Sequence, residues 1–191
     1  MLEAFLVSTL VVAVGELGDK TQLLTLVLAA RFRKPWPIVA GILVATLANH
    51  TVAAWLGQWV RDAVPPDLLR WGLALSFFAV AAWALKPDKF DEADAPPVSN
   101  RNVLTVTVVA FFLAEIGDKT QIATAMLAAK FDSLIAVVAG TTLGMLLVDA
   151  PTAFIGNAAA TRIPFRAVRI VAAALFAGLG VWVLLAPRFP Q

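Results

Sequence analysis

A seven-residue motif occurs twice in this chain, and each copy lies inside a long apolar run. The copies are residues 16–22 (ELGDKTQ) and residues 115–121 (EIGDKTQ), and they differ at one position. An ionised side chain at the depth of a lipid bilayer is energetically costly, so such residues usually line an ion or proton pathway. Two copies therefore predict one site built from two halves of the chain.

The composition places this chain in a membrane. Of its 191 residues, 60% are hydrophobic, and the mean hydropathy is +0.83. A soluble domain of this length cannot hide so much apolar surface in its core. Six apolar stretches are each long enough to cross the ~30 Å hydrocarbon layer: residues 2–30, 36–60, 68–86, 101–130, 133–157 and 165–186. We therefore expect an all-α membrane protein with six transmembrane helices, which partners the lipid bilayer and no nucleic acid.

The two halves of the chain resemble each other well beyond the motif. When residues 1–92 are laid over 100–191 without gaps, matches continue through all three apolar stretches. Matched pairs include Thr25 with Thr124, Gly41 with Gly140, Pro65 with Pro164, Phe77 with Phe176 and Trp83 with Trp182. We infer two three-helix repeats, over residues 1–86 and 101–191, joined by a linker at 87–100. Because three crossings are an odd number, the second repeat enters from the opposite side, and the repeats are inverted.

The basic residues predict the orientation, because cytoplasmic loops carry an excess of Lys and Arg. One side carries Arg31, Arg33, Lys34, Lys86, Lys89, Arg101, Arg162, Arg166 and Arg169. The other side carries Arg61, Arg70, Lys130 and Arg188. We therefore expect both termini outside and the linker in the cytoplasm. No Lys or Arg precedes the first apolar run, so this run is expected to be a membrane helix and not a cleaved signal peptide.

Helix geometry relates the charged residues of each motif. Glu16, Asp19 and Lys20 stand at i, i+3 and i+4, so they share one face of a continuous helix, and the second motif repeats this spacing. Gly18 and Gly117 weaken the helix where the charges lie, which favours a kink or a short unwound stretch.

The motif residues offer hard oxygen ligands. The candidate metal ligands are the four carboxylates, Glu16, Asp19, Glu115 and Asp118; the candidate supporting residues are Lys20, Thr21, Gln22, Lys119, Thr120 and Gln121. Oxygen ligands suit Mn²⁺, Ca²⁺ or Mg²⁺ better than Cu or Zn. Four carboxylates less two lysines leave a formal charge of minus two, which one divalent cation or two protons would neutralise. Competition of cation and protons for one site is the simplest route to exchange. The alternative is that each glutamate forms a structural ion pair with the lysine four residues on.

Two further polar residues, His50 and Asp149, occupy equivalent places in otherwise apolar stretches. They are candidates for carrying protons to and from the site or for holding its ligands, since histidine titrates near neutrality. The alternative is that each forms a hydrogen bond to a neighbouring helix.

Two Glu-apolar-Gly-Asp-Lys-Thr motifs in inverted three-helix halves resemble the Gdt-type family of cation/proton exchangers, also called uncharacterised protein family sixteen. The resemblance covers essentially the whole chain. It implies export of Mn²⁺, and of Ca²⁺ as a second substrate, against protons. It also implies that the four carboxylates are the cation ligands and that the lysines and threonines of the motifs support them. The short chain favours a bacterial member in the plasma (inner) membrane. A transporter of this kind is not an enzyme and needs no cofactor, since the ions are its substrates; a homo-oligomer is left open.

Other functions stay in view. A divalent cation channel or uniporter would also use acidic residues, but its flux would not respond to a pH gradient. An exporter of small anions or amino acids would use Lys20 and Lys119 as its site. An intramembrane aspartyl protease would carry a Tyr-Asp pattern, and this chain has no tyrosine. A structural subunit would tolerate Asp19→Asn and Asp118→Asn.

Overall fold

The computed structural model describes residues 1–87, 102–155 and 165–185, which form eight α-helices and, within those ranges, no strand. In chain order they are α1 (Leu2–Glu16), α2 (Lys20–Phe32), α3 (Pro35–Ala63), α4 (Pro66–Ala84), α5 (Val103–Glu115), α6 (Lys119–Lys130), α7 (Leu134–Ile155) and α9 (Phe165–Leu185). The prediction of an all-α protein is confirmed. The expected linker falls almost wholly on residues 88–101, outside the described residues.

Four of the described helices are long and apolar enough to cross a membrane, and they make this a multi-pass membrane protein. They are α3, α4, α7 and the stretch Arg166–Leu185 of α9. The other four are shorter: α1 has 15 residues, α2 and α5 have 13 each, and α6 has 12. A single crossing takes about 20 residues, so none of these four spans the hydrocarbon layer alone.

Each of the two motif-bearing stretches is divided into two helices. The first runs as α1 and α2 with a break after Glu16, and the second runs as α5 and α6 with a break after Glu115. Gly18 and Gly117 lie in the breaks with φ of 78° and 75°, a left-handed conformation that glycine adopts without strain. The expected interruption is confirmed. The expectation that Glu16, Asp19 and Lys20 share a face of one continuous helix is wrong.

Small residues allow the two repeats to pack closely against each other. A Cβ at Gly140 of α7 would collide with the Phe5 carbonyl oxygen of α1. At the equivalent place in the other half, a Cβ at Gly41 of α3 would lie 2.6 Å from the Thr107 Cβ of α5. Each of these contacts joins one repeat to the other, so both interfaces depend on a missing side chain.

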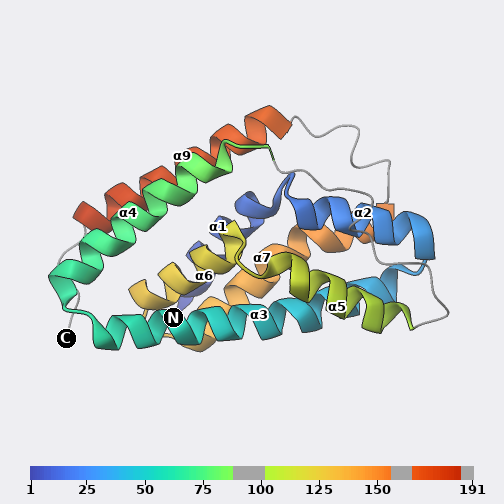
Figure 1. The fold of residues 1–191 in the computed structure, drawn as a ribbon, viewed down its shortest axis with the longest axis horizontal. Coiled ribbons are helices and arrows are strands. Elements are labelled where there is room, and N and C mark those ends of the chain that lie inside the picture. Colours follow the sequence, from blue (N-terminus) through green and yellow to red (C-terminus); the bar gives the residue numbers. More distant parts are fainter. Residues whose placement is uncertain (88–101, 156–164, 186–191) are drawn as a thin grey trace.

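The pair α4 and α9 lies side by side along one edge of the molecule, as Figure 1 shows, with α3 along the opposite edge and α1 and α6 between. Phe77 of α4 and Phe176 of α9, which are equivalent in the two repeats, are both fully buried in this core. Within the motifs the carboxylates are buried, whereas Leu17 and Ile116 are exposed.

Candidate cation site

The two helix breaks bring three carboxylates together. Glu16 ends α1, while Asp19 and Asp118 immediately precede α2 and α6. One carboxylate oxygen of each lies within 4.8 Å of the others, and all three residues are at most 1% exposed. The N-terminus of a helix carries a partial positive charge, so each aspartate stands where an anion is favoured. The fold therefore gathers negative charge from both halves.

The spacing of these oxygens fits a divalent cation. Oxygen ligands lie about 2.3–2.6 Å from Ca²⁺ and about 2.0–2.1 Å from Mg²⁺. Two ligands on opposite sides of one Ca²⁺ ion are therefore about 4.6–5.2 Å apart. A spread of at most 4.8 Å lets Glu16, Asp19 and Asp118 contact one such ion with little movement.

The fourth predicted ligand, Glu115, lies outside this group of three but within electrostatic reach of Asp118 and Asp19. It is fully buried, and its Oε2 accepts a hydrogen bond of 3.1 Å from Thr120. Glu16 has the matching arrangement, because its Oε2 accepts a hydrogen bond of 2.5 Å from Thr21. The other oxygen of each glutamate, Oε1, has no hydrogen-bond partner within the described residues. Each threonine thus orients its glutamate and leaves one oxygen for another ligand.

The lysines pair across the repeats. Lys20 Nζ lies 3.1 Å from Asp118 Oδ1, and Lys119 Nζ is bound by Asp19. The predicted alternative, in which each glutamate pairs with the lysine four residues on, is not the pairing found. Its geometry required a continuous helix, and the break after each glutamate turns the lysine toward the other half.

The two glutamines have a role that the sequence analysis missed. Gln22 Oε1 accepts a hydrogen bond of 2.8 Å from the Gly18 backbone N–H, and Gln121 Oε1 accepts one of 2.7 Å from the Gly117 N–H. A helix break frees backbone donors, and each glutamine side chain supplies an acceptor for one of them. The signal was present in the sequence, since each glutamine follows its glycine by four residues.

His50 and Asp149 differ in their hydrogen bonding. Asp149 Oδ1 accepts a hydrogen bond of 2.7 Å from Thr25 of α2. Asp149 also lies near enough to Glu16 for the two carboxylates to interact electrostatically. His50 is fully buried, and neither ring nitrogen has a hydrogen-bond partner among the described residues. Asp149 is thus joined to α2 by a hydrogen bond, whereas His50 is buried without a hydrogen-bond partner among the described residues.

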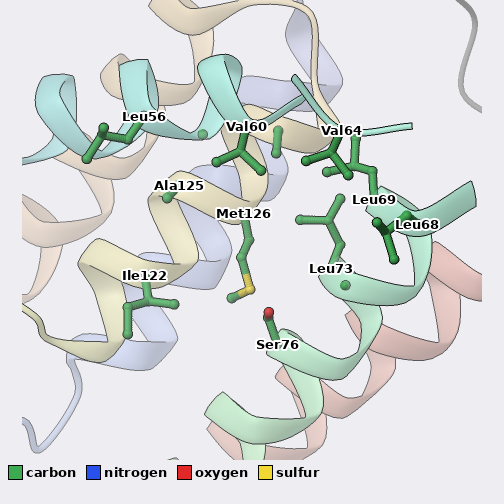
Figure 2. A pocket seen from close by; sticks show the side chains of 13 residues that line it. Leu56, Val60, Val64, Leu68, Leu69, Leu73, Ser76, Ile122, Ala125 and Met126 are labelled. Carbon is green, nitrogen blue, oxygen red and sulfur yellow. The ribbon is translucent and has the colours of Figure 1, made fainter. Parts of the chain in front are cut away.

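A separate apolar cavity of about 470 Å³ lies between α3, α4 and α6. Figure 2 shows Val60, Leu73 and Met126 facing into it, with Ser76 at its lower end. Its lining, which falls within the described ranges, contains no charged side chain. Such a cavity offers no carboxylate to a cation and shares no residue with the carboxylate site.

Buried carboxylates at two helix breaks, in a multi-pass membrane protein built from two similar halves, are typical of ion transporters. More particularly, the chain belongs to the divalent cation/proton antiporter GDT1 family, whose family model matches residues 4–92 and 103–190.

Two relatives extend this comparison. The chain is 50% identical over 177 residues to a Vibrio cholerae serotype O1 protein named "Putative manganese exporter", covering 92% of this chain and 88% of that protein. It is 29% identical over 196 residues to the GDT1-like protein sll0615 of Synechocystis, covering 92% of this chain and 94% of the relative. No solved structure matches the chain. The expected family is therefore confirmed.

Proposed function

We propose that this protein exports divalent cations, Mn²⁺ foremost, in exchange for protons at a site formed by Glu16, Asp19 and Asp118 with Glu115 beside it. The observation that carries the proposal is the convergence of buried carboxylates from both repeats within the span of one cation. Membership of a divalent cation/proton antiporter family supports the exchange reaction. The name of the Vibrio cholerae relative supports manganese as a substrate. Ca²⁺ is proposed as a second substrate, because oxygen ligands also suit it.

Exchange follows from competition for the same oxygens. Burial disfavours an ionised carboxylate unless a cation or a proton compensates its charge. The four motif carboxylates and two motif lysines sum to minus two, so the site takes either one divalent cation or two protons. An inward proton gradient would then drive the cation outward. The ions are substrates of the transporter, and the proposed reaction includes no enzymatic step or cofactor.

Proton access is proposed to involve Asp149. This residue is buried on α7, accepts a hydrogen bond from Thr25 of α2 and interacts electrostatically with Glu16. It can therefore accept a proton close to the cluster without being one of its ligands. His50, its equivalent in the first repeat, is proposed as a second member of this path on the strength of its burial without a partner among the described residues.

The proposed membrane layout has six crossings in two inverted repeats. The pairs α1 with α2 and α5 with α6 would each make one broken crossing, and α3, α4, α7 and α9 the other four. The crossed lysine contacts support this layout, because a two-fold axis produces reciprocal contacts of this form. Both termini would lie outside, with the linker at 87–100 in the cytoplasm.

The test is ion exchange by the purified protein in liposomes that contain a metal-sensitive and a pH-sensitive dye. Mn²⁺, Ca²⁺ and Mg²⁺ are added in turn across an imposed pH gradient. We expect Mn²⁺ movement coupled to opposite proton movement. Each of Glu16→Gln, Asp19→Asn, Glu115→Gln and Asp118→Asn should reduce this exchange by at least about a hundredfold, since a lost charge at a buried ion site costs several kcal/mol.

Asp132→Asn is the matched control, because this carboxylate is exposed and pairs with Arg61 away from the cluster. It should keep wild-type exchange. Retained exchange in any two of the four site variants would refute the shared site, and metal movement without proton movement would indicate a channel. An anion exporter is disfavoured, because both motif lysines are already bound by aspartates.

A further inference from the structure

The crossed lysine contacts involve two of the carboxylates that form the candidate cation site. Asp19 and Asp118 belong to the cluster of three carboxylates, and each is also bound by the lysine of the other repeat. An ammonium group and a divalent cation are attracted to the same carboxylate oxygens. The two motif lysines are therefore placed as competitors for the cation.

The position of the lysines along the helices favours a functional reason for them. Lys20 is the first residue of α2 and Lys119 the first of α6, where the positive end of the helix dipole disfavours a cation. A lysine there is stabilised chiefly by the aspartate opposite. Because both repeats carry this unfavourable placement, one residue in each half depends on the other half for its charge balance.

From these contacts we propose that Lys20 and Lys119 are tethered cations, which metal binding displaces from Asp118 and Asp19 and whose return drives metal release. The inference rests on the proposed function and adds to it a role for two residues. Metal binding would break the two lysine–aspartate contacts between the repeats, and metal release would restore them. The exchange of ions is thereby coupled to the contact between the halves.

The two lysines differ in exposure, which assigns them an order. The Lys20 side chain is 29% exposed, whereas the Lys119 side chain is 5% exposed. An ammonium that leaves its aspartate must find another partner, such as water or another acceptor oxygen. Lys20 can reach such surroundings directly, so the contact of Lys20 with Asp118 opens first in this conformation.

The test compares Mn²⁺ affinity with exchange rate in the full-length protein. Affinity is measured in detergent by the loss of the electron paramagnetic resonance signal of free Mn²⁺, and exchange is measured in liposomes. Lys20→Gln and Lys119→Gln should each bind Mn²⁺ at least about fivefold more tightly, the lower end of typical coupling between linked sites. Their maximal exchange rate should fall, because tighter binding mostly slows release. Lys119→Arg keeps the charge and should stay near wild-type affinity.

The matched control is Arg61→Gln, which removes a cation that pairs with Asp132 away from the cluster. Its Mn²⁺ affinity should equal that of the wild type. Unchanged or weaker binding in both lysine variants, at wild-type melting temperature, would overturn the inference. Failure of the wild type to bind Mn²⁺ would instead refute the proposed function, so the two failures are distinguishable.

A second measurement avoids substitution altogether. Saturating Mn²⁺ should increase the rate at which Lys20 of the wild-type protein reacts with an amine-selective acetylating reagent, because the displaced amine is no longer held by Asp118. Mass spectrometry of the peptide that contains Lys20 reads the rate, with Lys34, which precedes α3 and is exposed, as the internal reference. A Lys20 rate that Mn²⁺ leaves unchanged would overturn the inference even if the glutamine variants failed to fold.

Discussion

At the scale of single residues, the site depends on two glycines that hold a left-handed backbone. Gly18 and Gly117 end the helices so that the following aspartate and lysine turn toward the other repeat. The glutamine four residues after each glycine accepts a hydrogen bond from the backbone N–H of that glycine. The motif therefore interrupts the helix as well as supplying the charged residues.

Gly117 offers a clean test of this conformation. A Cβ added there meets nothing within 4 Å, so Gly117→Ala changes only the backbone preference at φ +75°. We expect the free energy of unfolding to fall by about 1–2 kcal/mol, the usual cost of the left-handed region for a residue with a Cβ. Thermal unfolding in detergent measures this loss. Gly117→Asn should lose less, because asparagine tolerates this region.

The control is Gly72→Ala in α4, where an added Cβ also meets nothing within 4 Å and no positive φ is required. Alanine favours a helix more than glycine does, by about 1 kcal/mol, so this variant should be at least as stable as the wild type. Equal loss in both alanine variants would show that the backbone angle at Gly117 is not the cause.

The residue types of the site could be predicted from the sequence, but their pairing could not. A repeated Glu-x-x-Asp-Lys pattern in an apolar run already indicates a buried ionic site. Which lysine meets which aspartate depends on the path of the chain after each break, over a separation of about a hundred residues. Sequence spacing alone favours a pair between each glutamate and the lysine four residues on, but such a pair requires a continuous helix, and the break removes it.

At the scale of the elements, hydropathy found the long helices and could not find the breaks. α3, α4, α7 and α9 correspond to four of the predicted stretches because each contains a long window of high mean hydropathy with few charged residues. The stretches 2–30 and 101–130 also read as single apolar runs, yet each is two helices. A window average does not register a three-residue interruption, whereas the glycines within it did signal the interruption.

The contact of α7 with α1 gives a prediction at this scale. Gly140→Ala would push a methyl group into the Phe5 carbonyl oxygen, so we expect α7 to move away from α1. Overpacking of this kind typically costs about 1–3 kcal/mol. Gly178→Ala in α9, whose added Cβ meets nothing within 4 Å, is the control and should not destabilise the protein. Thermal unfolding of both variants in detergent measures the difference; equal stability would mean that the α1 contact yields without cost.

At the scale of the whole molecule, the orientation in the membrane can be read directly. The chain contains no cysteine, so single cysteines can be introduced without first removing any. Glu3→Cys and Gln191→Cys should react with an impermeant thiol reagent in intact cells, and Ser99→Cys only after permeabilisation. The opposite pattern would reverse the orientation. Reaction of Glu3→Cys and Gln191→Cys from different sides would rule out an even number of crossings.

The reciprocal contacts between Lys20 and Asp118 and between Lys119 and Asp19 suggest how the duplicated chain evolved. Two identical units around a two-fold axis make contacts of this form, so an unduplicated ancestor with one motif would complete the site by dimerising with a copy of itself. Its copies would have had to insert in both orientations, which requires nearly equal numbers of Lys and Arg on the two sides. Gene fusion would have fixed one copy each way and freed the joined chain to acquire a charge bias.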